Sequence, residues 1–335
     1  MKTRELKLRA YAKGAPHRDL FELTEHELGA LEPGRVRVAV RYLSMDPFPR
    51  LRISGDASIA PQIPLGEVMI GRGAGEVIES RDEAFKPGDL VAGELGWRDV
   101  ADVDASDIRL VDPDLGPLSW SLGVLGPSGL AAYFSLLKTG EAKAGEHVLV
   151  SAAAGSVGAI AVQIARLHGA SPYAVAGGET QVEYLQDRLG LQAVADYTRH
   201  DDFDAMLAKA CPAGVDVFLD LVGGPLHDAA RLALRPHGRI VQVGTISSYN
   251  AGSEAADIGP RRLTELILKR ARITGFMVGD HAPDFGAALQ TLSQWLASGD
   301  LVYDEHVTDG LENTPAAFAA LFKPGPVGKQ LVKVS

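Results

Sequence analysis

Residues 151–170 read SAAAGSVGAIAVQIARLHGA, which is the pattern of a strand end, a glycine-broken turn and a helix. Gly155 and Gly158 have the spacing of a tight turn followed by a close helix contact, and Ile160 and Ile164 lie on one helical face. In this context, free backbone N–H groups and the positive end of a helix dipole point at a pyrophosphate. A simple tight turn is the alternative, because a glycine pair alone is weak evidence.

The alternation of strands and helices that follows favours the nucleotide-binding interpretation. Short β-branched runs alternate with helix-length segments, and these runs are HVLVSA, SPYAVAG, AVADY, VDVFLDLVG, RIVQVG and ITGFMV. Because each crossover must return along the length of a strand, alternation of this kind predicts parallel pairing in a doubly wound sheet. We therefore expect an α/β Rossmann domain over residues 125–301.

The rest of the chain predicts a second, β-rich domain, formed by residues 1–124 and 302–335. In GRVRVAVRYLSMDP the apolar Val36, Val38 and Val40 alternate with three arginines and Ala39, as in a strand with one buried face. The strand-like QLVKV near the C-terminus is expected to return to this domain. A barrel or a sandwich fits the short strands and the Gly and Pro turns between them.

Composition excludes several classes of partner. The 335 residues carry a formal net charge of -10, which repels the phosphate backbone of nucleic acid and an anionic bilayer. The first residues lack the apolar core of a signal peptide, and no later run reaches spanning length, so we expect a cytoplasmic protein. Cys211 is the single cysteine, which rules out a disulfide framework or a cysteine zinc site within one chain.

The end of the second strand of the Rossmann pattern bears on the choice of nucleotide. It closes with Ala176, Gly177 and Gly178, without the acid that binds the ribose 2′-hydroxyl of NAD, and this favours NADP. The alternative is that Glu179, just behind, serves NAD. Tyr197 follows the neighbouring third strand, so its hydroxyl is expected to reach the adenosine end.

Several segments together resemble the zinc-independent medium-chain dehydrogenase/reductases. They are KPGDLV, GPSGLAAYFSLLKTG, SAAAGSVGAIAVQIARLHGA, LKRARITGFMVGD and LENTPAAFAALFKPGPVGKQLVKV. More narrowly, YLSMDPFPR, GEVMIGRGAGEVIES and SSYN are similar to the branch of prostaglandin, curcumin and other NADPH-dependent enone reductases. The resemblance implies a GroES-like β-rich catalytic domain, NADP(H) as cofactor, hydride addition to the β-carbon of an α,β-unsaturated ketone or aldehyde, and a homodimer.

The resemblance also implies a set of site residues. Tyr249 of SSYN corresponds to an active-site tyrosine, whose phenol donates a hydrogen bond to the developing enolate; packing of a loop is the alternative. The implied cofactor-binding residues are Ala153, Gly155, Ser156, Val157, Gly158, Gly178, Gln181, Tyr197, Val222, Gly244, Ser247, Tyr249, Phe276, Val278 and Gly328.

No metal site is expected. Zinc-dependent relatives place a histidine beside a glutamate where this chain has Leu65, Gly66 and Glu67, and its nine histidines are scattered. Without a Lewis acid, reduction of a carbon–carbon double bond needs only a positioned nicotinamide and a group that holds the enolate oxygen.

Six positions depart from the family pattern and weaken the expected NADP preference or turnover. They are Gln181 for lysine, Gly178 for serine, Leu221 for asparagine, Ala131 for threonine, Pro326 for asparagine and Phe48 for tyrosine. Two other functions therefore remain open: quinone reduction, and nucleotide binding with little catalysis.

Overall fold

The computed structural model describes residues 1–251 and 258–334. Their contacts divide the chain into two units, each of which is described by itself below. The first unit consists of Met1–Gly123, Glu305–Lys323 and Lys329–Ser335, and the second of Val124–Asp304 and Pro324–Gly328.

The second unit contains a six-stranded parallel sheet in the order β10-β9-β8-β11-β12-β13. Its strands are β8 (His147–Val150), β9 (Ser171–Ala176), β10 (Val194–Asp196), β11 (Val215–Asp220), β12 (Leu234–Gln242) and β13 (Arg272–Gly275). This is the strand order of a doubly wound dinucleotide-binding domain, so the predicted Rossmann fold is confirmed. The run ITGFMV, expected to be all strand, leaves the sheet after Gly275.

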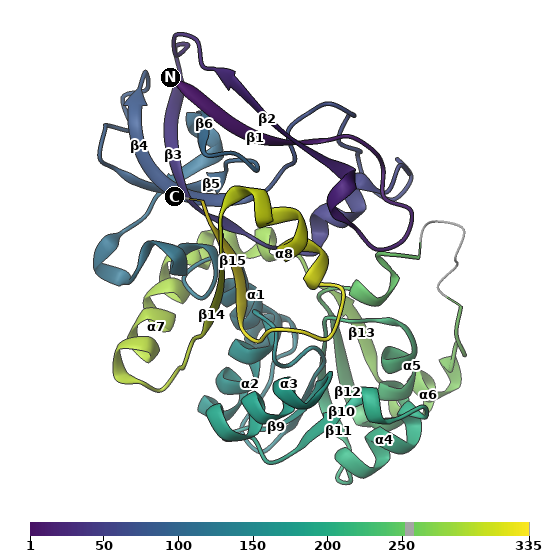
Figure 1. Cartoon of the computed structure of the whole chain (residues 1–335). Helices are drawn as coiled ribbons and strands as arrows, with labels where there is room; N and C mark the ends of the chain where they lie inside the picture. Colours follow the sequence, from purple (N-terminus) through teal and green to yellow (C-terminus); the bar gives the residue numbers. More distant parts are fainter. Residues whose placement is uncertain (252–257, 335) are drawn as a thin grey trace. The chain divides into compact units, whose positions relative to one another are not determined.

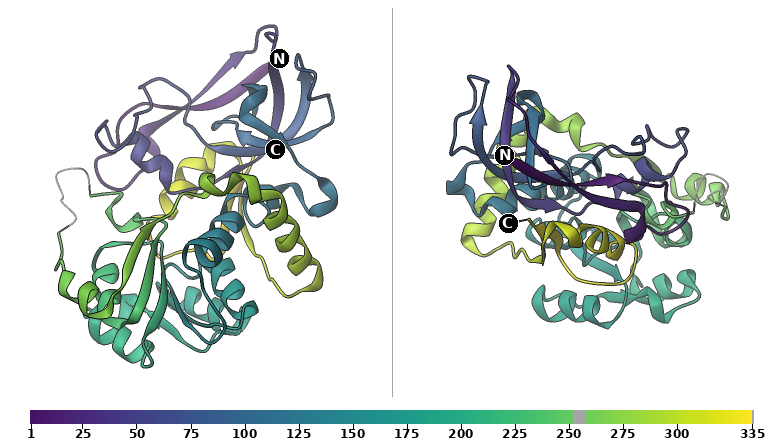
Figure 2. Two further views of the ribbon diagram at one scale, coloured as in Figure 1. Left: turned by 180° about the vertical axis from the view of Figure 1, so that it is seen from behind. Right: turned by 45° about the horizontal axis from the view of Figure 1, so that its top comes forward.

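Helices lie on both faces of this sheet, as Figures 1 and 2 show. They are α1 (Pro127–Phe134), α2 (Gly158–Leu167), α3 (Glu179–Glu183), α4 (Phe203–Ala210), α5 (Gly224–Ala233), α6 (Leu263–Lys269) and α7 (Phe285–Ser298). Helix α2 packs on β8 and β9, while α5 packs against both α4 and α6. With both faces covered, Val148, Leu149 and Phe218 are wholly buried, which explains the continuous apolar runs of the central strands.

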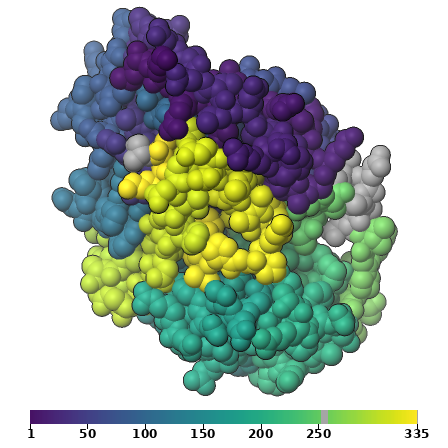
Figure 3. Space-filling view, viewed as in Figure 1, coloured from purple at the N-terminus to yellow at the C-terminus, as the bar shows by residue number. Residues whose placement is uncertain are grey.

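A short segment from near the C-terminus belongs to this unit and not, as expected, to the β-rich one. Residues 324–328, here called the C-terminal strap, meet the turn after β8, where Gly155 and Gly328 form an isolated parallel bridge. Figure 3 shows one face of the molecule in space-filling form, with much of the second unit in teal. Nothing in the local sequence signalled the bridge between Gly155 and Gly328, because it depends on residues more than a hundred positions apart.

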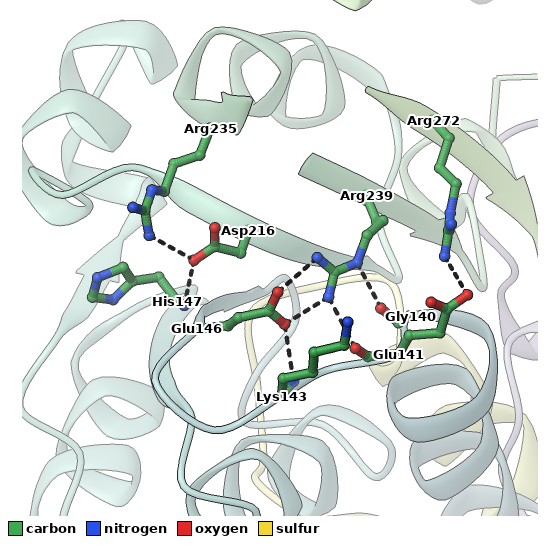
Figure 4. A network of polar contacts seen from close by, with 9 residues as sticks. All are labelled: Gly140, Glu141, Lys143, Glu146, His147, Asp216, Arg235, Arg239 and Arg272. Atoms are coloured by element: carbon green, nitrogen blue, oxygen red, sulfur yellow. Dashed lines mark hydrogen bonds and ion pairs between the residues drawn. The ribbon is translucent and has the colours of Figure 1, made fainter. Parts of the chain in front are cut away.

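The amino ends of the strands are joined by an ionic network (Figure 4). Arg239 donates to both carboxylate oxygens of Glu146, at 2.8 and 2.6 Å, and to the carbonyl oxygen of Gly140 at 2.8 Å. Asp216 accepts the His147 backbone N–H at 2.9 Å and an Arg235 N–H at 3.0 Å. The network ties neighbouring strands at the sheet edge opposite the turn after β8.

The first unit is β-rich. A seven-stranded sheet has the order β14-β15-β3-β4-β5-β7, with β6 also paired to β3, and β1 and β2 form a separate antiparallel pair. The strands are β1 (Lys2–Leu8), β2 (Phe21–Glu27), β3 (Arg35–Ser44), β4 (Arg72–Ser80), β5 (Leu90–Glu94), β6 (Val100–Asp104), β7 (Ile108–Leu110), β14 (Glu305–Asp309) and β15 (Lys329–Lys333), and the helix is α8 (Thr314–Ala320). As expected, Val36, Val38 and Val40 of β3 are buried.

The closing strand returns to this unit through β15, which pairs antiparallel with β3. Lys329, at its start, is wholly buried, and its Nζ lies 2.7 Å from Oδ1 of Asp46. Burial alone would raise the pKa of Asp46, but the Lys329 charge and hydrogen bond hold it below its usual value. The pair therefore stays ionised and fastens the strand to the loop after β3.

Within the described ranges, no helix is both long and apolar enough to cross a membrane.

Candidate nucleotide-binding site

The carboxyl edge of the parallel sheet carries the expected cofactor residues. In an open parallel sheet, the crevice outside the carboxyl ends of the strands, where the strand order reverses, is the usual ligand site. Here the order reverses between β8 and β11. The loops after β8, β9, β10, β11, β12 and β13 contain, in turn, the phosphate turn, Gly178, Tyr197, Val222, Gly244 with Ser247 and Tyr249, and Phe276 with Val278.

The phosphate turn has a backbone that accepts little substitution. Ala152 adopts a left-handed φ of +45°, a strained conformation for a residue with a Cβ. A Cβ on Gly158 would lie 2.3 Å from the carbonyl oxygen of Ala152, so glycine is required where α2 meets the turn. Helix α2 begins without a side-chain cap, which leaves its amino end available to an anion. The turn therefore fits a pyrophosphate.

The expected residues of this turn differ in their exposure. Gly155, Ser156 and Val157 are partly exposed. Ala153 is wholly buried, and its N–H already donates to the carbonyl oxygen of Val175 at 3.0 Å. The buried Ala153 thus fixes the turn to β9. The Gly155 N–H donates to the carbonyl oxygen of Ala152 at 2.9 Å, so Ser156 and Val157 are left to present their backbone N–H groups to a ligand.

The C-terminal strap closes one side of the turn. Gly328 donates its N–H to the carbonyl oxygen of Ala154 at 2.8 Å. Gln181 of α3 reaches the same strap: its Nε2 donates to the Gly325 carbonyl oxygen at 3.2 Å, and its Oε1 accepts the Gly177 N–H at 3.0 Å. The Gln181 amide, expected at the 2′-phosphate, is therefore engaged within the chain and links the end of β9 to the strap.

Asp196, the last residue of β10, holds the backbone that follows β9; the sequence patterns did not single out this acid. Oδ1 of Asp196 accepts the Gly178 N–H at 2.9 Å and the Thr198 hydroxyl at 2.7 Å. Burial alone would raise the pKa of Asp196, but these hydrogen bonds and the Arg199 charge hold it below its usual value. Its Oδ2 lies 3.2 Å from Nε of Arg199, an ion-pair contact without a hydrogen bond, so Oδ1 makes all the hydrogen bonds of this carboxylate.

Tyr197 lies over the end of the second strand. A Cβ on Gly177 would come within 2.6 Å of the Tyr197 ring, so the ring packs directly on this glycine. The side chain keeps 38% of its surface exposed, and burial of the rest raises the pKa of its hydroxyl, which stays protonated as a donor. Arg188, the first cation along the sequence after Gly178, forms an ion pair with Asp304 at 3.1 Å and is not directed at Tyr197 by any hydrogen bond or ion pair.

A buried polar network joins the turns after β8 and β11. Oδ1 of the wholly buried Asp220 accepts the Val222 N–H at 2.9 Å and the Ser151 hydroxyl at 3.0 Å, and Oδ2 lies 2.8 Å from Nδ1 of His227. Ser247 continues it, donating from its hydroxyl to the Val222 carbonyl oxygen at 2.7 Å. The sequence patterns did not single out this network; the signal available was Asp220 at the end of a strand, three residues before the pair Gly223 and Gly224.

Tyr249 follows the short 3₁₀ segment Ile246–Ser248, and its N–H donates to the Ile246 carbonyl oxygen at 3.3 Å. The side chain is partly exposed, and its hydroxyl makes no hydrogen bond with any residue among 1–251 and 258–334. A phenol without a partner in the described chain is available to a ligand.

The other departures from the family pattern have varied settings. Leu221 begins the turn after β11, Ala131 lies in α1 and Pro326 in the strap, while Phe48 in the first unit is 54% exposed. Leu65 to Glu67 form a turn in the first unit. In the part of the chain that the structure describes, no three His, Cys, Asp or Glu side chains gather as metal ligands would.

Two protein-family models match the chain: one described as the N-terminal domain of oxidoreductase over residues 4–111, and one described as zinc-binding dehydrogenase over residues 156–294. The chain is 40% identical over 331 residues to a putative NADP-dependent oxidoreductase, YfmJ, of Bacillus subtilis (strain 168), covering 99% of this chain and 97% of that protein. It is 38% identical over 330 residues to the NADPH-dependent curcumin reductase of Escherichia coli (strain K12), covering 96% and 94%.

A solved structure extends this likeness to three dimensions. CurA from Vibrio vulnificus in complex with NADPH matches with a TM-score of 0.91 and 35% identity, over 99% of both chains.

Proposed function

The chain belongs to the medium-chain dehydrogenase/reductases, in the zinc-independent branch of the curcumin, prostaglandin and alkenal reductases, and from this membership we propose its reaction. It reduces the carbon–carbon double bond of an α,β-unsaturated ketone or aldehyde with NADPH. The observation that carries the proposal is the full-length likeness to a chain solved with NADPH, together with a phosphate turn whose helix begins uncapped.

The proposed binding roles follow the carboxyl edge of the sheet. Backbone groups of Gly155, Ser156 and Val157 bind the pyrophosphate, assisted by the amino end of α2. Gly178 and Tyr197 receive the adenosine end, where the Tyr197 hydroxyl is a neutral donor to the 2′-phosphate. The nicotinamide half lies along Val222, Gly244, Ser247, Phe276 and Val278, and Gly328 closes the turn from the strap.

We assign the catalytic role to Tyr249. When bound, NADPH supplies a hydride to the β-carbon of the enone, and negative charge develops on the carbonyl oxygen of the substrate. The Tyr249 hydroxyl, which has no partner among the described residues, donates a hydrogen bond to that oxygen and stabilises the charge as it forms.

The reaction is proposed to need no metal. The chain carries Leu65 and Gly66 beside Glu67 where zinc-dependent relatives carry a ligand histidine, and no alternative ligand set gathers in the described residues. Exhaustive chelation is therefore expected to leave the rate of enone reduction unchanged. Stoichiometric zinc by elemental analysis, with activity lost on its removal, would refute the proposal.

The decisive experiment separates this function from its two alternatives. A thermal-shift titration with NADPH measures binding, since a ligand that binds only the native state raises its stability. NADPH oxidation is then followed with a panel of small enones and a panel of quinones. Turnover of enones supports the proposal, turnover of quinones alone favours quinone reduction, and tight binding without turnover indicates a nucleotide-binding protein.

A homodimer and a cytoplasmic location are also proposed. Strand β13 ends the sheet order, and no strand among residues 1–251 and 258–334 pairs with its outer edge. On α6, which precedes β13 in the chain, Leu263, Ile267 and Leu268 are 59%, 74% and 64% exposed. An open edge together with exposed apolar side chains suits a second copy of the chain. Light scattering after size-exclusion chromatography tests the dimer, and cell fractionation tests the location.

A further inference from the structure

The ring of His281 stacks on two phenylalanines from different elements of the nucleotide unit. Its centroid lies 4.7 Å from that of Phe134 with 3° between the planes, and 5.7 Å from that of Phe276 with 21° between the planes. Phe134 is the wholly buried last residue of α1, and Phe276 is the first residue after β13. His281 therefore connects the rigid interior of the unit to the loop that leaves the sheet edge.

Besides this ring stack, residues 276–278 of the loop are held by few backbone hydrogen bonds and by packing on an apolar cluster. Phe276 donates its N–H to the Gln242 carbonyl oxygen at 3.0 Å, and the next residue, Met277, is 70% exposed. Phe276 and Val278 pack against a small apolar cluster built on Leu130, Phe134 and Ala288. The Met277 carbonyl oxygen also accepts the Asp280 N–H at 3.2 Å. Two backbone hydrogen bonds, the apolar packing and the His281 ring stack thus define the path of residues 276–278.

His281 acts through the faces of its ring. The imidazole makes no ion pair or hydrogen bond with the residues that the structure describes. The charged groups near it in sequence are Asp280 and Asp284 on its own segment, whereas α1 and α7 carry no charged residue. A flat, apolar ring would therefore make the same contacts, while a small side chain would not.

We infer that His281 is a positioning residue for the nicotinamide half of the cofactor. By stacking on Phe134 and Phe276, it holds residues 276–278 where Phe276 and Val278 meet the nicotinamide. The inference rests on the proposed NADPH-dependent function, and it assigns to His281 no contact with the cofactor itself.

The test compares NADPH with 2′-phospho-ADP-ribose, which has the adenosine and pyrophosphate parts but lacks the nicotinamide. Calorimetric titration gives both dissociation constants for the parent, His281→Ala and His281→Phe. Losing both ring contacts is expected to leave the binding-competent path of residues 276–278 about a tenth populated, which weakens binding about tenfold. We expect His281→Ala to raise the Kd of NADPH about tenfold and leave that of 2′-phospho-ADP-ribose unchanged, and His281→Phe to restore the parent values. His306→Ala, at an exposed histidine of β14, is the matched control and should change neither.

Two results would overturn the inference about His281. Unchanged NADPH binding in His281→Ala, or equal weakening of both ligands, overturns the inference, because the latter indicates general destabilisation. If the alanine variant does not fold, His281→Leu replaces it, since leucine keeps apolar volume without a ring face and should behave as alanine would. The proposed function itself is refuted if the parent protein binds NADPH no more tightly than 2′-phospho-ADP-ribose and reduces no enone. A negative result confined to the His281 variants refutes only the inference about His281.

Discussion

Gly328 donates its backbone N–H to the carbonyl oxygen of Ala154 over 2.8 Å, so a residue near the C-terminus completes the turn that begins the nucleotide site. Its φ of +70° is left-handed, and a Cβ on Gly328 would lie 2.2 Å from the Asp304 carbonyl oxygen. The strap position therefore accepts only glycine.

Gly328→Ala is expected to displace the strap and to raise the Kd of NADPH about tenfold, the effect of losing roughly 1.4 kcal/mol. The measurement is NADPH titration beside a melting curve. Gly299→Ala is the control, because Gly299 has a similar φ of +79° but open space around its Cβ position. A Gly328→Ala variant that binds NADPH as tightly as Gly299→Ala would show that the strap does not shape the site.

Tyr249→Phe separates catalysis from packing. If the hydroxyl stabilises the enolate only as charge develops, the variant should lose about a hundredfold or more in kcat, while its NADPH affinity and melting temperature stay near those of the parent. The ring still fills the same space, so a purely structural tyrosine predicts either a lower melting temperature or no change. Parent-like turnover of an enone by this variant would remove Tyr249 from the mechanism.

We expect Gln181 to limit the preference for NADPH over NADH. A glutamine carries no charge, so the 2′-phosphate receives no lysine charge at this position. The Gln181 amide is also engaged by hydrogen bonds with Gly177 and Gly325. Gln181→Lys is expected to increase the ratio of NADPH to NADH affinity by about tenfold or more, since a charge-assisted hydrogen bond contributes roughly 1.5 to 3 kcal/mol.

Gln181→Ala is the matched control for this test. It loses the same two hydrogen bonds without adding a cation, so it should weaken both nucleotides alike. Titration of each variant with both nucleotides gives the two ratios. Equal ratios in the lysine and alanine variants would mean that this side chain does not reach the 2′-phosphate.

The Glu146–Arg239 pair predicts acid sensitivity of the nucleotide unit. Burial alone would raise the pKa of Glu146, but the Arg239 hydrogen bonds and the Lys143 N–H hold it below its usual value. A carboxyl whose folded pKa is depressed adds stability above its unfolded pKa, and this stability is lost as the pH falls through the folded pKa. Urea unfolding from about pH 7 to about pH 3 should therefore show a decline that Glu146→Gln makes shallower.

At neutral pH, Arg239→Gln should lower the free energy of unfolding by about 2 kcal/mol, because it leaves the Glu146 carboxylate, whose side chain is only 21% exposed, without its charged partner. Arg272→Gln is the control: its pair with Glu141 is about half exposed on both sides, so its loss should cost little. Equal destabilisation by the two substitutions would contradict a special role for the Glu146 pair.

The sequence by itself determined the order and kind of the elements in the nucleotide unit and the place of its phosphate turn. Strand and helix periodicity depends on neighbours a few residues away, and the requirement for Gly158 arises from atoms six residues distant, at Ala152. The alternation of apolar and other residues around Val36 likewise predicted a strand with one buried face in the β-rich unit. Local patterns of this kind need no knowledge of the rest of the fold.

Only the tertiary structure decided what the polar groups around that turn do. The sequence places Gln181 at the 2′-phosphate, and the structure shows that its amide donates a hydrogen bond to a carbonyl oxygen 144 positions away. The Asp196 carboxylate, from β10, accepts the backbone N–H that follows the end of β9. The strap reaches the phosphate turn from near the end of the chain, and His281 meets Phe134 only because α1 and the loop after β13 pack together. A hydrogen bond or ring contact forms within a few ångströms and is indifferent to sequence separation, so such partners appear only when the packed fold brings distant segments together.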